Sequence, residues 1–297
     1  MHYFPIEYDE PLFRPPSEAD SLILQITLGC SWNKCAFCEM YTTKKFTVRA
    51  KKDVFEEINN IAAVVPSINK VFLADGNPLV ISTPRLLTVL KKLKDNFPRL
   101  RRVSTYALPA DINRKTIDEL KELREAGLNL LYIGVESGDN EVLFSINKNE
   151  TFESTETALL KAKEAGLKTS VILINGLGGK RLSQQHAINS ARLLNSVQPE
   201  YASTLVLTYY RGIDRFKERY KGDFISLNLK ELFQEMELFI QHTELEKTIF
   251  RSNHASNFLV LSGVLGKDKN NFLTTIKEAL DNPILPLIDS HQRSISM

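Results

Sequence analysis

The chain has few of the features that mark secreted or membrane proteins. Its 297 residues include only three cysteines, and this small, odd number argues against the disulfide framework of a secreted domain. No run approaches the roughly 18 apolar residues of a membrane-spanning helix. Residues 1–16 are polar, aromatic and proline-rich, and they lack the apolar core of a signal peptide. We therefore expect a cytoplasmic protein with no membrane partner.

An excess of charge of one sign is also missing. Lysine and arginine total 38 against 36 aspartates and glutamates, which gives a net charge of +2. Nucleic-acid binding proteins usually carry a larger positive excess, so nucleic acid is not indicated as a partner. Charged residues make up 25% and hydrophobic residues 43% of the chain, which is the composition of an ordinary globular enzyme.

From residue 21 onward, short apolar runs alternate with amphipathic segments of helical period. The apolar runs predict strands at 21–28, 70–74, 100–106, 130–135, 168–174 and 201–207, and the segments between them predict helices at 51–65, 83–97, 114–126, 153–165 and 183–196. Apolar strands joined by helices form parallel sheets. We therefore predict an α/β fold, a partial (β/α)6 TIM-like barrel, with a flavodoxin-like open sheet as the alternative.

Three parts of the chain differ in pattern. Residues 1–20 are expected to form an irregular N-terminal arm, because four prolines there remove backbone donors. Residues 21–210 carry the strand–helix rhythm and predict the barrel core. Residues 211–297 predict a C-terminal extension with helices at 229–242 and 268–281. Because no linker precedes this extension, we expect it to pack on the core.

All three cysteines, Cys30, Cys35 and Cys38, lie in the segment GCSWNKCAFC directly after the first strand. Thiolates are soft ligands that bind zinc or iron–sulfur clusters. A structural zinc site normally has four ligands, and every histidine is distant in the sequence. Three thiolates on a four-iron cluster leave one iron open for reaction. A zinc site and chance proximity of buried cysteines are the alternatives.

The spacing Cys-x4-Cys-x2-Cys after the first strand, with Phe37 before the last cysteine, resembles the radical S-adenosylmethionine (radical SAM) enzymes, whose first gap is usually three residues. The resemblance implies a [4Fe–4S] cluster on the three cysteines, with S-adenosylmethionine bound at the open iron. It implies reductive cleavage to a 5′-deoxyadenosyl radical that abstracts hydrogen from a substrate. It further implies oxygen sensitivity and an electron donor such as flavodoxin or ferredoxin.

The resemblance also implies that residues at the carboxyl ends of strands bind the cofactor. In the family, the end of the second strand contacts the methionyl ammonium, the end of the fourth contacts the ribose, and a glycine-rich stretch after the fifth lies against the adenine. The matching candidates here, together with Phe37, are Asp75, Gly76, Asn77, Glu136, Ser137, Asn175 and Gly176. The alternatives are an ordinary Asp-Gly turn, a capping role for Glu136 and an ordinary glycine turn. No phosphate-binding P-loop pattern follows the fifth strand.

A last group of candidates faces the substrate. Residues 251–257, RSNHASN, are dense in small polar side chains, so His254 and Asn257 are candidates for substrate contact or catalysis. Tyr210, just after the sixth strand, is a third candidate. The alternative for residues 251–257 is a hydrogen-bonded loop. The segment Lys44-Lys45-Phe46 and Arg49 are expected on a solvated basic face, with an anion site as the alternative. No motif identifies the substrate, and the spacing does not support coproporphyrinogen. The alternative function is a non-catalytic zinc- or cluster-binding interaction protein.

Overall fold

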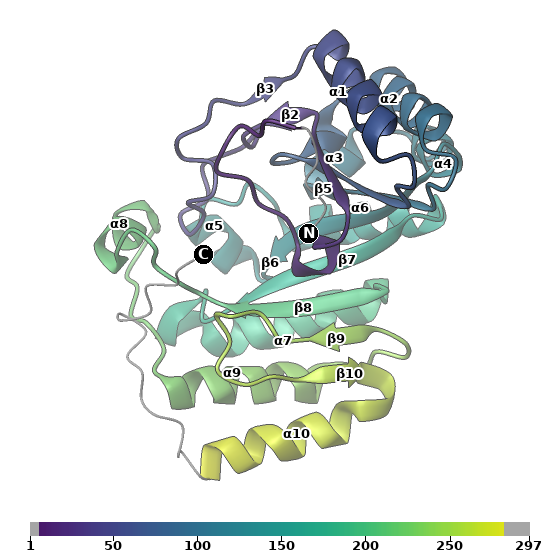
Figure 1. Ribbon diagram of the computed structural model, residues 1–297. Helices are drawn as coiled ribbons and strands as arrows, with labels where there is room; N and C mark the ends of the chain where they lie inside the picture. The colour runs from purple at the N-terminus through teal and green to yellow at the C-terminus, as the bar shows by residue number, and fades with distance from the viewer. Residues whose placement is uncertain (1–5, 282–297) are drawn as a thin grey trace. The chain divides into compact units, whose positions relative to one another are not determined.

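The computed structural model describes residues 6–281, which fall into two compact units. The first unit comprises the chain up to residue 33 together with residues 40–133 and 157–169. The second comprises residues 34–39, 134–156 and the chain from residue 170 onward. Each unit combines parallel strands with the helices that connect them (Figure 1). The predicted limits of arm, core and extension remain a prediction.

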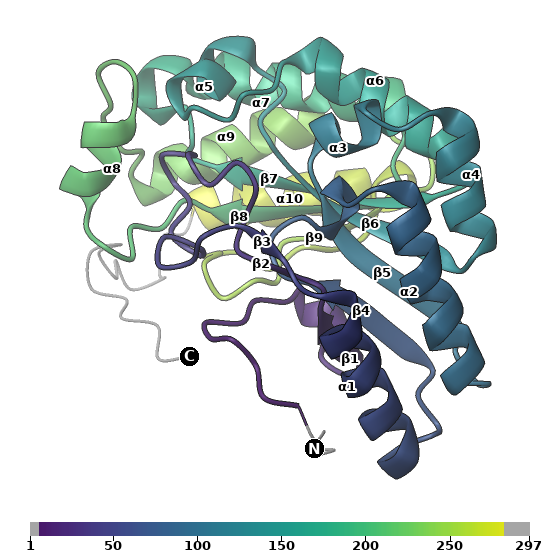
Figure 2. The same cartoon turned by 90° about the horizontal axis from the view of Figure 1, so that it is seen from above.

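In the first unit, four strands hydrogen-bond in parallel in the order β1, β4, β5, β6. Their bounds are β1 Leu22–Gln25, β4 Lys70–Ala74, β5 Arg102–Ala107 and β6 Leu128–Glu136, and β6 continues into the second unit. The helices of this part are α1 Lys51–Val64, α2 Thr83–Asn96, α3 Pro109–Asn113 and α4 Ile117–Glu125, with 3₁₀ helices η1 Pro16–Glu18 and η2 Pro78–Val80. Helix α2 lies between α1 and α4 (Figure 2). β1 is buried along its whole length, as expected for a parallel strand covered by helices.

In the second unit, β7 Lys168–Asn175, β8 Tyr201–Val206 and β9 Ile249–Arg251 pair in parallel, and β10 Ser262–Val264 joins β9 in antiparallel orientation. Helix α6 Phe152–Glu164, most of which belongs to the first unit, precedes β7. The remaining helices are α5 Asn140–Ser145, α7 Gly179–Val197, α8 Ile213–Arg219, α9 Leu229–His242 and α10 Leu265–Asp281. Helix α9 packs between α7 and α10 (Figure 1). This packing brings residues of α7 and α9 beneath the ends of β7 and β8.

The six predicted parallel strands are all present, so the α/β prediction is confirmed. The first of them is shorter than predicted, because the chain bends at Ile26. There Ile26 donates its N–H to Ala74 and accepts from Arg49 N–H. Residues Thr27–Leu28 then form β2, which pairs with β3 (Thr47–Val48) in antiparallel orientation. The bend depends on contacts with distant residues, which the local apolar pattern does not encode.

The helix predicted at 114–126 begins three residues later. Thr116 caps α4, because its hydroxyl accepts the N–H of Glu119 while the Glu119 carboxylate accepts the N–H of Thr116. This capping box marks the N-terminus of α4. The residues before it form the separate short helix α3, which has Pro109 at its start. The Thr-x-x-Glu pattern in the sequence was the signal for this start.

The N-terminal segment is attached to the first unit by a buried carboxylate. Glu18 in η1 is fully buried, and its Oε1 accepts from Tyr132 Oη at 2.6 Å and Arg102 Nη2 at 2.8 Å. Its other oxygen accepts from the hydroxyl of Ser21. A buried carboxylate is tolerated only with such hydrogen-bonded partners, so Glu18 fixes η1 against β5 and β6.

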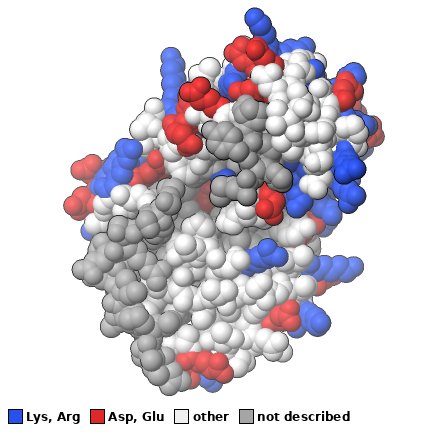
Figure 3. Space-filling view, viewed as in Figure 1, with Lys and Arg blue, Asp and Glu red and all other residues white. Residues whose placement is uncertain are grey.

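Charged side chains of both signs are interspersed on the face shown in Figure 3, as far as the described residues reach. Lysine and arginine do not merge there into one continuous positive surface. Within residues 6–281, no helix combines the length and the apolar character needed to cross a membrane.

Candidate functional site

The turn after β4 holds the chain on both sides of Cys30. Asp75 Oδ2 accepts from Gly29 N at 3.4 Å. Asn77 Oδ1 accepts from Ser31 N at 2.9 Å, and Asn77 Nδ2 donates to Ser31 Oγ at 2.9 Å. Two side chains that we predicted to bind the cofactor therefore fix the residues that flank the first cysteine.

Gly76 is required by the same close approach. Its φ of +55° lies in the left-handed region, and a Cβ at this position would lie 1.9 Å from Gly29 O and 2.8 Å from Cys30 Cα. Only glycine avoids this clash. The close approach that we predicted toward a ligand is thus made toward the backbone of the cysteine segment.

Asp75 is the acidic side chain of this turn. Its side chain is fully buried, and its Oδ2 lies 2.7 Å from Lys44 Nζ. Burial raises the pKa of the Asp75 carboxyl, and Lys44 opposes this rise. Asp75 Oδ1 has no hydrogen-bond partner within residues 6–281. We expected Lys44 on a solvated basic face, and this prediction is wrong, because its side chain is 5% exposed.

Arg49 is also engaged with the protein. Its guanidinium forms two hydrogen bonds to the Glu57 carboxylate, at 2.9 and 2.6 Å. A paired, bidentate arginine of this kind fixes two elements relative to each other. Lys44 and Arg49 therefore pair with carboxylates and do not form the predicted solvated basic face, whereas Lys45 between them is exposed.

At the end of β6, Glu136 forms a buried ion pair. Its Oε1 lies 2.9 Å from Lys148 Nζ, and the two side chains are 9% and 5% exposed. The backbone of Glu136 has a φ of +67°. Gly134 leaves room for this side chain, since a Cβ there would lie 2.1 Å from Glu136 Oε1. The carboxylate predicted to meet the ribose therefore has a cationic partner that the sequence pattern did not indicate.

Ser137, the next residue, is fully buried. Its Oγ lies 2.8 Å from His186 Nδ1 and accepts from Asp139 N at 3.0 Å. Gly138 N donates to Ser190 Oγ at 2.9 Å. Helix α7 thus supplies the partners that fix the turn after β6.

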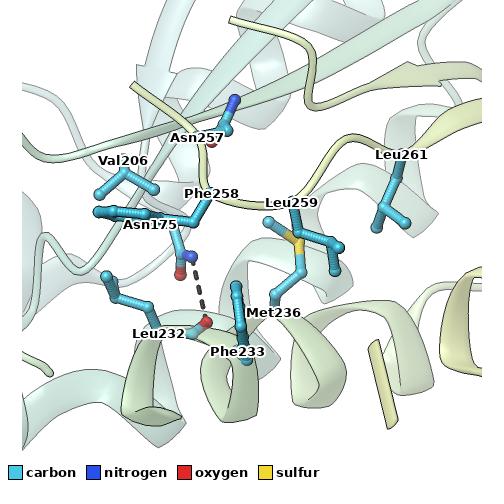
Figure 4. Close-up of a pocket in the computed structure, with 9 residues that line it drawn as sticks. All are labelled: Asn175, Val206, Leu232, Phe233, Met236, Asn257, Phe258, Leu259 and Leu261. Carbon is cyan, nitrogen blue, oxygen red and sulfur yellow. Dashed lines mark hydrogen bonds between the residues drawn. The ribbon is translucent and has the colours of Figure 1, made fainter. Parts of the chain in front are cut away.

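The end of β7 is held from α9. Asn175 Nδ2 donates to Leu232 O at 3.1 Å, and Gly176 N donates to Glu235 Oε1 at 2.6 Å. Gly176 has a φ of +86°, and a Cβ there would lie 2.9 Å from Leu232 Cδ2. Figure 4 shows Asn175 and Leu232 beside Asn257 around a cavity of about 10 Å³. A cavity of this size holds at most one water molecule.

The segment with Cys35 and Cys38 belongs to the second unit. Ala36 N donates to Ile146 O at 2.8 Å. Arg219 Nη1 donates to Cys38 O at 3.5 Å. These contacts fix the backbone around both cysteines.

The side chains of the same segment are anchored as well. Arg215 Nη1 lies 2.5 Å from Glu39 Oε1. Phe37 is partly buried and packs against the apolar cluster that contains Phe216 and Leu207. The aromatic residue of the cysteine motif therefore contributes to the core of the second unit.

The polar loop after β9 hydrogen-bonds to the edge of β8. Val206 N donates to Ser256 Oγ at 3.1 Å, and Asn257 Nδ2 donates to Thr204 O at 2.8 Å. Ser256 N donates to His254 Nδ1 at 3.1 Å, and burial lowers the pKa of His254. These are the contacts of the hydrogen-bonded loop that we gave as the alternative, so the loop's role toward substrate remains a prediction.

Tyr210 lies beyond the end of β8 and is 57% exposed. Its neighbour Tyr209 points inward, where its hydroxyl lies 3.0 Å from Ser226 Oγ. Of the three predicted substrate residues, Tyr210 is thus the most accessible.

The cysteines suit an iron–sulfur cluster in their chemistry. None of the three forms a disulfide, and the segments around Cys30 and Cys38 are fixed by the contacts described above. Within residues 6–281, no group of three or more Cys, His, Asp or Glu side chains is gathered as a single metal ion would require. A four-iron cluster needs no such convergence, because each thiolate binds a different iron.

Several partners of the predicted residues were not identified from the sequence, namely Lys44, Lys148, His186, Glu235 and Arg215. They lie between 12 and 176 positions along the chain from the residues that they contact. One of them had a local signal: Glu235 falls on the apolar face of α9 between Leu232 and Phe239. A carboxylate at such a position is buried and requires a partner.

Comparison with known structures identifies the fold. Coproporphyrinogen III oxidase HemN from Escherichia coli, a radical SAM enzyme, superposes with a TM-score of 0.57 at 20% identity, over 74% of this chain and 52% of its own. Methylornithine synthase PylB superposes with a TM-score of 0.52 at 15% identity, over 87% and 81%. At this identity the similarity concerns the fold alone, and it confirms the predicted partial-barrel α/β fold.

Comparison of sequences identifies the family. Over 158 residues the chain is 30% identical to the heme chaperone HemW of Bacillus subtilis (strain 168), an alignment that covers 51% of this chain and 41% of HemW. The chain therefore spans less than half the length of that relative. The Radical SAM superfamily profile matches residues 24–194, more than half of the chain and the region that holds all three cysteines. This chain belongs to the Radical SAM superfamily, whose members use a [4Fe–4S] cluster and S-adenosylmethionine.

Proposed function

We propose that this enzyme binds a [4Fe–4S] cluster through Cys30, Cys35 and Cys38 and reductively cleaves S-adenosylmethionine for hydrogen abstraction from a substrate. The observation that carries the proposal is the cysteine segment itself: three thiols in one loop, on backbone that is hydrogen-bonded on both sides of Cys30 and around Cys38. When bound, the reduced cluster supplies the electron that breaks the sulfur–carbon bond and releases a 5′-deoxyadenosyl radical.

The residues around the cysteines bind and orient S-adenosylmethionine. Asp75, Gly76 and Asn77 fix the conformation at Cys30, and the unpartnered Oδ1 of Asp75 is left to accept a hydrogen bond from the ammonium of the cofactor. Glu136, held by Lys148, accepts from ribose hydroxyls. The turn at Asn175 and Gly176 contacts the adenine, and α9 holds this turn in place.

Other residues exclude water and meet the substrate. Phe37 anchors the cysteine segment on the apolar cluster of the second unit, and a radical intermediate requires the exclusion of water that such apolar packing favours. His254, Asn257 and Tyr210 line the substrate side in this proposal. A low-potential protein such as flavodoxin or ferredoxin delivers the electron.

The test is anaerobic reconstitution followed by reduction. The loaded protein should contain about four irons per chain and, after dithionite, should convert S-adenosylmethionine slowly to 5′-deoxyadenosine even without substrate. Exposure to oxygen should abolish this activity. The variant Cys35→Ala is the control and should form no product. A protein that binds one zinc and no iron, or that releases no 5′-deoxyadenosine over hours, would overturn the proposal.

A second candidate function is supported by one observation, the 30% identity to a heme chaperone over 158 residues. In this alternative the protein binds heme, either as its only ligand or in addition to a substrate of the radical reaction. Titration of the protein with hemin, followed by its absorbance spectrum, tests it directly. A spectrum equal to that of free hemin at all ratios removes this candidate and leaves S-adenosylmethionine cleavage untouched.

A further inference from the structure

Glu235 on α9 is a buried carboxylate, and its contact with Gly176 occupies only one of its two oxygens. It is 3% exposed. Its Oε1 accepts from Gly176 N at 2.6 Å, while Oε2 has no partner in the described part of the chain. Leaving a buried polar atom without a partner destabilises the folded state. Glu235 Oε2 therefore requires a further hydrogen-bond donor.

His186 on α7 lies beside this carboxylate and connects two strand ends. Its Nε2 is 3.1 Å from Ile174 O and 3.8 Å from Glu235 Oε1, and its Nδ1 is 2.8 Å from Ser137 Oγ. A carbonyl oxygen can only accept, so Nε2 carries a hydrogen. In the neutral imidazole, Nδ1 then accepts from the Ser137 hydroxyl. His186 thereby links the turn after β6 to the last residues of β7.

A small cavity lies next to both side chains. It has a volume of about 20 Å³, and its lining includes Glu235, His186 and Thr204. Thr204 Oγ1 on β8 is buried and, like Glu235 Oε2, has no partner among the described residues. A polar cavity of more than roughly 10–15 Å³ can hold one water molecule if it offers hydrogen-bonding groups. Two unpartnered oxygens on the walls of this cavity meet that requirement.

We infer that Glu235, His186 and one water molecule bound to Glu235 and Thr204 form a buried network that positions the carboxyl ends of β6, β7 and β8. Glu235 and His186 are positioning residues, since they act on a ligand only through the turns at Ser137 and Gly176. This inference rests on the proposed function in one respect, namely that these turns contribute to the S-adenosylmethionine site. The network itself exists with or without the cofactor.

Hydrogen–deuterium exchange on the full-length protein without cofactor tests the network. Glu235→Ala should speed exchange on the order of tenfold in peptides covering residues 174–178, because Gly176 N loses its acceptor. Glu235→Gln should behave like the wild type, since its amide oxygen still accepts from Gly176 N. Gln234→Ala, exposed on the same helix, is the matched control. Unchanged exchange in Glu235→Ala, or a change confined to α9, overturns the inference.

Two variants of His186 keep the test informative if Glu235→Ala does not fold. His186→Asn can still accept from Ser137, and His186→Gln can still donate to Ile174. The first should therefore protect residues 137–139 and expose residues 174–178, and the second should do the reverse. Equal behaviour of the two variants contradicts the linking role of the imidazole.

The bound water has its own test. A high-resolution crystal structure of the wild type should contain one water within hydrogen-bond distance of Glu235 and Thr204. Thr204→Ser should retain it, and Thr204→Val, which has nearly the same shape and no hydroxyl, should lose it. An empty cavity in the wild type overturns this part of the inference.

Cofactor affinity separates the inference from the proposed function. In reconstituted protein with full iron content, Glu235→Ala should bind S-adenosylmethionine about tenfold more weakly by calorimetry, and Glu235→Gln should match the wild type. Unchanged affinity in Glu235→Ala overturns the positioning role. Failure of the wild type itself to release 5′-deoxyadenosine counts instead against the proposed function.

Discussion

Polar residues at the strand ends of this protein form hydrogen bonds and ion pairs with other residues of the chain. Asn77 is bonded to Ser31 on both sides of its amide, and Glu136 is paired with Lys148. Each contact fixes a loop conformation before any ligand binds. Such preorganisation lowers the cost of binding, because the loop does not have to be ordered at that moment.

The three cysteines are expected only to ligate the cluster. Replacing Cys30, Cys35 or Cys38 singly by alanine should reduce the iron content after anaerobic reconstitution to near background, because two thiolates cannot hold a four-iron cluster firmly. Far-UV circular dichroism should remain that of the wild type. Retention of a full complement of iron in any of the three variants would remove that cysteine from the ligand set.

Glu235 should make stability depend on pH. Burial raises the pKa of its carboxyl in the folded state, and His186, the Ser183 hydroxyl and the Gly176 N–H oppose this only in part. The folded state then binds more protons than the unfolded state, so the stability tied to this group is complete below the unfolded pKa and is lost as pH rises toward the folded pKa. Relative to Glu235→Gln, the wild type should lose up to about 1 kcal/mol per pH unit in that range. Urea unfolding of both proteins between about pH 4 and 7 measures the difference; parallel pH profiles contradict it.

Among the elements, α8 is the one that supports the cysteine segment of the second unit. It contributes Arg215, which pairs with Glu39, and Arg219, which donates to Cys38 O. The helix has only seven residues, so its own hydrogen bonds give it little stability. Its position depends on Phe216 in the apolar cluster beneath it.

Loss of the Arg215 contact should loosen this segment without unfolding the protein. In Arg215→Gln we expect several-fold faster hydrogen exchange in residues 34–39 and a shorter lifetime of the reconstituted cluster in air. The pair is partly exposed, so global stability should change by less than about 1 kcal/mol. Lys217→Gln, exposed on the same helix, should show neither effect, and an equal response of both variants would show that charge alone is responsible.

The 3₁₀ helix η1 depends on one residue in the same way. Glu18→Ala should lower the free energy of unfolding by about 3 kcal/mol, because it leaves Arg102 and Tyr132 without their buried partner. Chemical denaturation measures the loss, and Glu7→Ala, exposed in the same segment, is its control. A change below about 0.5 kcal/mol would show that η1 is attached by apolar contacts alone.

On the scale of the whole molecule, we expect stability to come from apolar packing and not from the metal centre. The fully buried side chains are mostly Leu, Ile, Val and Phe of the strands and of the helices that cover them. A chain of this length buries roughly three quarters of its surface on folding. A loop of three ligands adds little to such a core.

Removal of iron should therefore leave the fold intact. Protein stripped by a chelator under air should keep the circular dichroism spectrum of the loaded protein and a single cooperative unfolding transition, while all S-adenosylmethionine cleavage is lost. Reconstitution should restore activity. An unfolded or aggregated apoprotein would mean that the cluster is a structural element.

The sequence by itself determined the six predicted parallel strands, the helices between them and the family. Period-two and period-3.6 patterns are local, and each depends on residues within one or two turns of one another. The cysteine motif is equally local, since its ligands lie within one loop. For this reason the six parallel strands and the radical SAM assignment were predictable.

The tertiary structure decided which partner each polar residue of the site has. Asp75 meets Lys44 across 31 positions, and Gly176 meets Glu235 across 59. Such pairs arise only when strands and helices pack, and no short-range pattern records which side chains packing will bring together. The burial that results also sets the charge state of these groups, because desolvation depends on every neighbouring element at once.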